Sequence, residues 1–131
     1  LFVAKYNYRT RELNFVNAGH NPPVLYHKES RRLVFLRSGC VGIGMLDEIP
    51  FIHHGSMLIE EPSKMICYTD GLVEVIDDTG VGFGTAVIEE NIANDAPVAE
   101  NINSIIESRR ILSGSTAIFD DITILGIEFY A

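Results

Sequence analysis

Acidic residues occur twice in this sequence at the point where an apolar, strand-like run meets a turn. In MICYTDGLVE the apolar run leads directly into Asp70, and the following Gly71 allows a sharp backbone turn that presents the carboxylate to a cleft. In FDDITILGI, Asp120 and Asp121 come directly before the last apolar run. Carboxylate oxygens are the ligands that Mg²⁺, Mn²⁺ and Ca²⁺ prefer, so the pattern indicates a site for a hard divalent cation.

These acids form one site only if the two strands beside them are neighbours. If the strands pair antiparallel, the end of the first and the start of the second lie at the same sheet edge, and the acids converge. Like charges a few ångströms apart repel by about 1 kcal/mol in water, and by more where they are partly buried, so such a cluster favours a bound cation. The alternative is that Asp70 caps a turn while Asp120 and Asp121 are solvated loop residues.

The elements that must position these acids are mostly strands. Apolar and β-branched runs separated by short polar turns predict two hairpins, followed by longer-range strands. The segment 37–50, which holds three glycines and a proline, is expected to be a loop. The strands are expected at residues 2–8, 12–17, 24–26, 33–36, 51–60, 64–69 and 121–130.

Two segments carry helical rather than alternating spacing. Residues 97–112 place Val98, Ile102, Ile105 and Ile106 on one stripe. Asp95 is the expected N-cap of that helix and Gly114 its stop, and residues 85–92 predict a shorter helix. With hairpins in place of βαβ units, the fold class is α+β and mostly antiparallel.

Composition and charge limit the class of protein. With 131 residues, of which 47% are hydrophobic, the chain is expected to form one globular unit. Its 18 acidic and 10 basic residues give a net charge of −8, which repels nucleic acid and anionic lipid and favours a divalent cation or a basic protein surface. No apolar run is long enough to span a membrane and no signal sequence is recognisable, so we expect a cytoplasmic protein. Cys40 and Cys67 lack zinc-site or redox spacing and are expected to be reduced, buried thiols.

Three motifs together resemble a known family. NAGHNPP, YTDGLVE and DDIT, in this order and at this separation, are similar to the C-terminal half of the SpoIIE/RsbU-type branch of the PPM metal-dependent serine/threonine protein phosphatases. The resemblance extends from residue 2 to about residue 127. It implies a β-sandwich flanked by helices that holds two Mn²⁺ or Mg²⁺ ions, which activate a water molecule to attack phosphoserine or phosphothreonine. It also implies that Asp70 and Asp120 are catalytic metal ligands, with Asp121 as a third candidate ligand.

The resemblance also predicts ligands that this sequence does not contain. The family pattern has a Gly-Asp pair and an Asp-x-x-Gly-His-Gly motif upstream of the residue that matches Asp70, and neither occurs here. The segment DDTGVG, residues 77–82, lacks the histidine and follows Asp70, so it is expected to be a turn. Residues 1–131, which begin strand-like and without Met, are therefore expected to be the C-terminal portion of an incomplete domain. Such a portion is expected to be inactive alone and to form homodimers through uncovered strand edges.

His20 of the NAGHNPP motif and the remaining polar clusters can each be explained as structural or surface residues rather than as site residues. His20, between Gly19 and Asn21, is expected to tie a turn together, with a substrate contact as the alternative, and Gly71 is a second candidate substrate-binding residue. The adjacent His53 and His54 would face opposite sides of a strand and are expected on the surface. The glycine-bearing GCVGIGM is expected to be a flexible loop, and the pairs Arg31–Arg32 and Arg109–Arg110 to be solvated.

Two functions of different classes remain. The first is the second half of a protein phosphatase whose substrate is a phosphoprotein, of the kind whose relatives act on phosphorylated anti-anti-sigma factors. The second is a noncatalytic interaction module with a degenerate phosphatase fold. The retained acids at positions 70 and 120 favour the first function, and the missing upstream acids favour the second.

Overall fold

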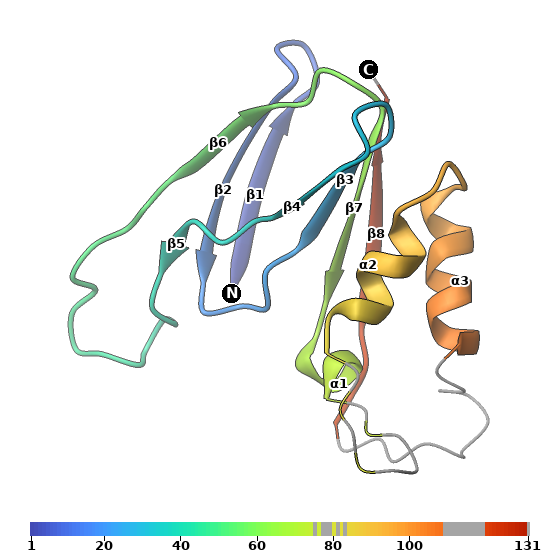
Figure 1. The fold of residues 1–131 in the computed structure, drawn as a ribbon. Helices are drawn as coiled ribbons and strands as arrows, with labels where there is room; N and C mark the ends of the chain where they lie inside the picture. Colours follow the sequence, from blue (N-terminus) through green and yellow to red (C-terminus); the bar gives the residue numbers. More distant parts are fainter. Residues whose placement is uncertain (75, 77–79, 81, 83, 109–119, 131) are drawn as a thin grey trace.

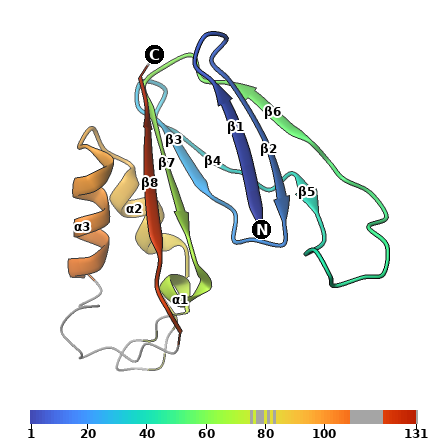
Figure 2. The same cartoon turned by 180° about the vertical axis from the view of Figure 1, so that it is seen from behind.

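The chain folds into two β-sheets that face each other, with helices covering the outer face of one of them (Figures 1 and 2). This architecture comes from a computed structural model, which describes residues 1–74, 76, 80, 82, 84–108 and 120–130. The expected class, α+β with mostly antiparallel strands, is confirmed. Within the described residues, no helix combines the length and the apolar character needed to cross a bilayer.

The first sheet is built around β2 (Glu12–Ala18). On one side β2 pairs antiparallel with β1 (Phe2–Asn7), which confirms the first predicted hairpin. It also pairs parallel with the short β5 (Gly39–Cys40) and antiparallel with β6 (Gly55–Leu58). Alternation of buried and less buried residues along β2 turns Leu13 and Phe15 toward the second sheet.

Two predictions for this region were wrong in part. The segment 37–50 was expected to be a loop, but it contains β5, which is too short to show a periodic pattern. The strand expected at 51–60 is confined to β6, because the apolar side chains of Phe51 and Ile52 are exposed to solvent rather than packed on a neighbour. Strand pairing resumes at Gly55, opposite Phe15, where the aromatic ring lies against the glycine.

The second sheet has the order β4-β3-β7-β8, and every pair in it is antiparallel. Pairing of β3 with β4 confirms the second predicted hairpin. Pairing of β7 with β8 confirms that the two strands beside the acids are neighbours. The strands are β3 (Val24–His27), β4 (Arg32–Phe35), β7 (Ser63–Tyr68) and β8 (Ile124–Phe129).

Three helices are described: α1 (Asp70–Val73), α2 (Ala86–Ile92) and α3 (Val98–Ser108). The segment expected to turn after Asp70 forms the single helical turn of α1. The expected helix at 85–92 is confirmed as α2, and α3 confirms the start of the expected helix at 97–112, whose residues beyond 108 and expected stop Gly114 lie outside the described residues.

The expected cap of α3 was wrong. The backbone N–H of Val98 donates to the carboxylate of Glu128, 3.2 Å away, so the cap comes from β8 rather than from the preceding residues. Asp95 instead forms an ion pair with Arg31 at 3.2 Å. Helix α3 can lie this close to β8 because Gly126 has no side chain: a Cβ there would be 2.7 Å from Val98.

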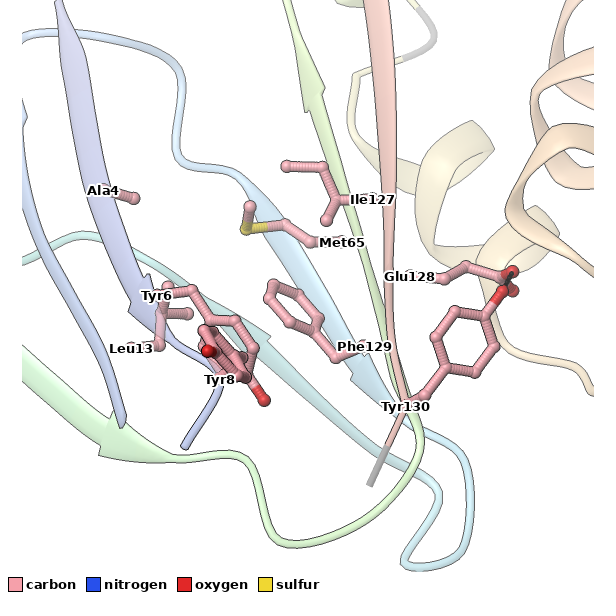
Figure 3. Close-up of a pocket in the computed structure, with 9 residues that line it drawn as sticks. All are labelled: Ala4, Tyr6, Tyr8, Leu13, Met65, Ile127, Glu128, Phe129 and Tyr130. Atoms are coloured by element: carbon pink, nitrogen blue, oxygen red, sulfur yellow. Dashed lines mark hydrogen bonds between the residues drawn. The ribbon is translucent and has the colours of Figure 1, made fainter. Parts of the chain in front are cut away.

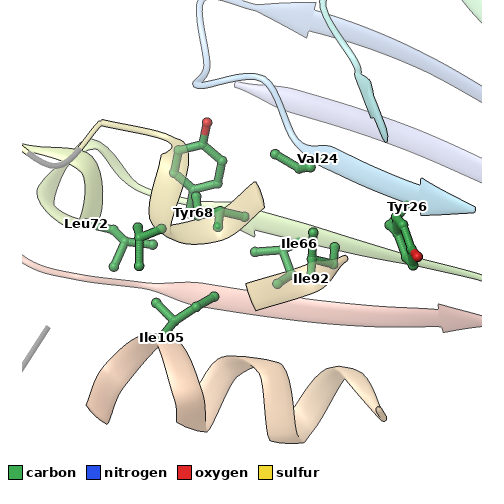
Figure 4. Close-up of a cluster of buried hydrophobic side chains, with 9 residues drawn as sticks. Val24, Tyr26, Ile66, Tyr68, Leu72, Ile92 and Ile105 are labelled. Atoms are coloured by element: carbon green, nitrogen blue, oxygen red, sulfur yellow. The ribbon is translucent and has the colours of Figure 1, made fainter. Parts of the chain in front are cut away.

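Apolar side chains form one cluster on each face of the second sheet. The cluster beneath the helices fixes α1 in place through the fully buried Leu72 (Figure 4). This cluster comprises Val24, Tyr26, Ile66, Tyr68, Leu72, Val87, Ile88, Ile92 and Ile105. The cluster between the sheets comprises Leu13, Phe15, Leu25, Leu36, Ile59, Met65 and Phe129.

The sandwich is open along one side, between β1 and β8. Among the described residues, β1 pairs only with β2 and β8 only with β7, so both strands carry an unpaired edge. A cavity of about 360 Å³ lies between these edges, where the ring of Tyr6 meets that of Phe129 at 4.9 Å (Figure 3). A second hollow of about 350 Å³ lies toward the start of both strands and is lined by Thr69 and Thr123. We call this open side the β1–β8 slot.

Candidate divalent-metal centre

The ends of β7 and β8 bring the predicted acids to one edge. Tyr68, the last residue of β7, is paired with Ile124, the first residue of β8. Asp70 therefore begins α1 directly beside the point where Asp121 leads into β8. The expectation that these two strands are antiparallel neighbours and share an edge is confirmed.

Thr69 links the two strand ends. Its backbone N–H donates to the carbonyl of Thr123 at 3.1 Å, and its hydroxyl accepts the N–H of Thr123 at 2.9 Å. The same hydroxyl donates to the carbonyl of Asp121 at 3.1 Å. The segment between the last pair of the β7–β8 ladder and the acids is thus held by three hydrogen bonds, which fixes the relative positions of Asp70 and Asp121.

Gly71 explains why the motif reads Thr-Asp-Gly. A Cβ at this position would lie 2.6 Å from the carbonyl oxygen of Asp121 and 3.0 Å from that of Asp120. Both atoms belong to the backbone, so neither can move aside as a flexible side chain would. Gly71 is buried, and its missing side chain is what allows α1 to pack against the Asp120–Asp121 segment.

The three carboxylates are exposed and make local contacts. An oxygen of Asp70 accepts the N–H of Gly71 at 3.1 Å, and an oxygen of Asp120 accepts the N–H of Asp121 at 2.8 Å. Their chemistry fits hard cations such as Mg²⁺ and Mn²⁺. Their number does not fill a site, since the described residues hold no group of three or more acidic, histidine or cysteine side chains positioned for a metal ion. The acids thus have the chemistry of divalent-cation ligands, and the described residues do not supply a complete ligand set.

Two side chains of β7 just before the acids are desolvated. Burial raises the pKa of the Tyr68 hydroxyl, against the opposing charge of Arg37, while Glu89 raises it further. Burial also raises the pKa of the Cys67 thiol to about 11, so this thiol stays protonated near neutral pH. Cys67 and Cys40 are both free, as expected, but each is only partly buried, whereas buried thiols were expected.

His20 ties its own turn together, as the sequence predicted. Its backbone N–H donates to the side-chain oxygen of Asn17 at 2.8 Å, and its Nδ1 lies 2.7 Å from the carbonyl oxygen of Asn21. Because a carbonyl only accepts, Nδ1 carries the proton of this hydrogen bond. The ring also lines the same hollow of the slot as Thr69 and Thr123, so a substrate contact by His20 stays a prediction.

The other polar clusters are separate from the acids. His53 and His54 are exposed, as expected, although they lie outside any strand. Arg31 pairs with Asp95, whereas Arg109–Arg110 and most of the expected turn at 77–82 lie outside the described residues.

Sequence reasoning missed the hydrogen bonds by which the Thr69 side chain joins the two strand ends. The signal for Thr69 was present, because a hydroxyl between an apolar strand and an acid can bond to a neighbouring backbone.

This architecture is that of the PP2C-type phosphatase domains. The SiaA-PP2C domain of Pseudomonas aeruginosa matches with a TM-score of 0.69 and 25% identity, over 92% of this chain and 48% of that one. The phosphatase domain of SpoIIE from Bacillus subtilis, presoaked with Mn, matches with a TM-score of 0.69 and 16% identity, over 100% of this chain and 56% of that one.

The sequence places the chain within this class. The family model described as Stage II sporulation protein E (SpoIIE) matches residues 1–130, and the chain belongs to that family. Protein IcfG from Synechocystis sp. is 28% identical over 129 residues, which cover 97% of this chain and 20% of IcfG. The chain thus spans a fifth of this relative and about half of the two solved chains.

Proposed function

We propose that residues 1–131 are the C-terminal portion of a phosphatase domain that hydrolyses phosphoserine and phosphothreonine in a protein substrate, using Mn²⁺ or Mg²⁺. The observation that carries this proposal is the contact of Gly71 with the Asp120–Asp121 backbone, which sets Asp70 beside the acids of the last motif. Membership of the SpoIIE family and the phosphatase fold support it.

In this proposal Asp70 and Asp120 hold divalent ions through their exposed carboxylates, with Asp121 as the third candidate. When bound, such ions supply hydroxide near neutral pH and neutralise phosphoryl oxygens. The chain's own contribution is positional. Thr69 and Gly71 keep the two acidic segments in register, so that the carboxylates do not have to reorganise when an ion binds.

The remaining ligands are proposed to come from upstream strands of a longer protein. The chain spans 48% and 56% of the two solved phosphatase chains, and in the part of the chain that the structure describes, the edges of β1 and β8 that border the slot have no partner strand. The Gly-Asp pair and the Asp-x-x-Gly-His-Gly motif, which this sequence lacks, would supply the missing carboxylates. Residues 1–131 alone are therefore proposed to be inactive. By resemblance, the substrate is an anti-anti-sigma factor in the cytoplasm.

Turnover of p-nitrophenyl phosphate with Mn²⁺ tests this function in the longer protein. Asp70→Asn and Asp120→Asn are expected to lower kcat by at least about 100-fold, because each removes a metal ligand. Glu90→Gln, which changes an exposed acid on α2 away from the acidic segments, is the matched control and should keep normal turnover. Unchanged turnover in Asp70→Asn would remove that residue from the mechanism.

A noncatalytic interaction module is the second candidate. It is favoured by the lack of a three-ligand group among the described residues and by the local hydrogen bonds of the carboxylates. Turnover by the longer protein distinguishes the two candidate functions. Mn²⁺-dependent turnover supports the enzyme, and its absence in a folded longer protein supports the interaction module.

A further inference from the structure

His27 is a buried histidine to which the proposed function gives no role. It is the last residue of β3 and pairs with Ser63, the first residue of β7, whereas the acids follow the other end of β7. In Figures 1 and 2 this end of the second sheet lies near the C-terminus, at the end of the sandwich opposite α1. Only 2% of the residue is exposed to solvent, so its imidazole depends on protein partners.

The hydrogen bonds of His27 fix which ring nitrogen carries the proton. The Ser63 hydroxyl donates its single proton to the carbonyl of Glu61 at 2.8 Å. Nδ1 of His27 lies 3.0 Å from the same hydroxyl oxygen, so Nδ1 has to donate. Nε2 lies 3.4 Å from Nη2 of Arg32, which can only donate, so Nε2 accepts. A neutral ring satisfies both contacts.

A second proton on this ring would make the contact with Arg32 repulsive. The N–H of a protonated Nε2 would face the N–H of the guanidinium, with two donors and two positive charges at hydrogen-bond distance. The pKa of His27 is lowered first by burial and then by the charge of Arg32, and Glu61 raises it in part. Arg32 is exposed and can turn into solvent, whereas the ring is enclosed.

His27 is the member of this cluster whose charge changes just below neutral pH. Arg32, on β4, stays protonated at any such pH. Glu61, on the approach to β7, stays ionised because the Ser30 hydroxyl, as the largest cause, lowers its pKa through a hydrogen bond. The other charged side chains on the turn, on the approach to β7 and on the neighbouring strands are Lys28, Glu29, Arg31, Glu60, Lys64 and Glu128.

The turn after His27 is joined to the approach to β7 by several further hydrogen bonds. The backbone N–H of Lys28 donates to the carbonyl of Pro62 at 2.9 Å. The Glu61 carboxylate accepts the N–H of Glu29 at 2.6 Å, the N–H of Ser30 at 2.8 Å and the Ser30 hydroxyl at 2.6 Å. The carboxylate contacts are exposed, whereas the contact between His27 and Ser63 is buried and lies beneath them.

We propose that His27 is a proton-operated latch that joins the turn between β3 and β4 to the approach to β7. With a neutral ring the latch is closed, because Nδ1 holds Ser63 and Nε2 holds Arg32. When Nε2 takes up one proton from solvent, Arg32 turns outward and this end of the second sheet opens locally. The latch lies at the opposite end of β7 from the acids, so the proposal does not depend on the phosphatase function.

Amide hydrogen exchange of this chain tests the latch. Protection factors, which remove the intrinsic effect of pH on exchange, are compared at about pH 7.5 and about pH 5.5. The cost of protonating the buried ring is absent above pH 6.5, the ordinary value for histidine, and grows as the pH falls toward the lowered pKa. Protection of residues 25–35 and 61–64 should therefore fall by at least about threefold relative to residues 13–17 of β2.

Two variants separate the latch from a general effect of acid. His27→Gln has no titratable ring, so the pH-dependent fall in protection should disappear. Arg32→Gln removes a charge that lowers the His27 pKa, so the ring protons of His27 should titrate at a higher pH in an NMR titration, and the fall should shrink by at least about twofold. Arg9→Gln, which changes an exposed arginine on the turn between β1 and β2, is the matched control and should alter neither result.

The variant at the exposed position keeps the proposal testable even where His27→Gln does not fold. Three results would overturn the latch: protection that does not fall at these two segments on acidification, an equal fall in His27→Gln, or a His27 ring that titrates at the same pH in Arg32→Gln and in wild type. None of these measurements needs turnover, so a longer protein without phosphatase activity would refute the proposed function and leave the latch to be decided by exchange.

Discussion

The backbone of Gly71 lies against the carbonyl oxygen of Asp121, at a distance that leaves no room for a methyl group. This contact joins the start of α1 to the segment that leads into β8.

Gly71→Ala is expected to separate the two acidic segments. The new Cβ would be 2.6 Å from the Asp121 oxygen, so the backbone has to shift. We expect a loss of about 1 to 3 kcal/mol in the free energy of unfolding by urea, and in the longer protein a weaker affinity for Mn²⁺ measured by calorimetry. Gly82→Ala is the control, since a Cβ there meets nothing within 4 Å. Equal stability of the two variants would contradict the role of this contact.

Thr69→Val is expected to loosen the same edge without adding bulk. Valine has no hydroxyl to donate to the Asp121 carbonyl or to accept the Thr123 N–H, so two hydrogen bonds are lost. We expect a loss of about 1 to 2 kcal/mol in urea unfolding and a decrease in Mn²⁺ affinity in the longer protein. Thr69→Ser keeps the hydroxyl and should retain most of the free energy of unfolding and most of the Mn²⁺ affinity. If the serine variant is as unstable as the valine variant, the side-chain packing of Thr69 rather than its hydrogen bonds would explain the loss.

The sequence predicted this edge because its signals are local. An apolar run that ends in Thr-Asp-Gly and another that begins after Asp-Asp are each readable within ten residues, and antiparallel pairing then brings them together. The hairpins were predictable for the same reason, since short turns join strands that are adjacent in the sequence.

What the sequence did not predict depends on contacts between distant segments. Glu128 caps α3 from 30 residues away, so the local candidate Asp95 was preferred in error. Lys64 is fully buried in β7, where its ammonium donates to the side-chain oxygens of Asn94 and Asn101 and to the carbonyl of Ala96. A lysine in a strand is ordinarily expected to be exposed, and only the positions of those acceptors explain its burial.

Lys64 gives a prediction for pH. Burial lowers the pKa of its ammonium to about 8, assisted by Lys28 and opposed by Glu128 and Asp95. In the unfolded chain this group titrates near 10.5, so between pH 8 and pH 10.5 the unfolded state binds more protons than the folded state. The cost of keeping the ammonium buried is therefore fully present below pH 8 and is relieved as the pH rises through this window.

The measurement compares urea unfolding of wild type and Lys64→Met at about pH 7 and about pH 10. The wild-type free energy of unfolding should rise by roughly 1 to 3 kcal/mol relative to the variant between these pH values. Lys5→Met, which changes an exposed lysine on β1, should show no such relative change. A difference between wild type and Lys64→Met that is constant with pH would contradict the lowered pKa.

Self-association is expected through the β1–β8 slot. Leu125 is 55% exposed on β8, whose outer edge has no partner strand among the described residues, and it lines the hollow nearest the acids. An unpaired edge with an apolar side chain favours pairing with a second copy.

The weight-average mass of this chain in sedimentation should therefore rise with concentration toward a homodimer. Leu125→Glu should suppress that rise, because a dimer would bury the added carboxylate. Ile43→Glu, on the equally exposed 41–54 loop, should leave it unchanged. A wild type that stays monomeric at every concentration, or a Leu125→Glu variant that associates as wild type does, would show that this edge does not pair with itself.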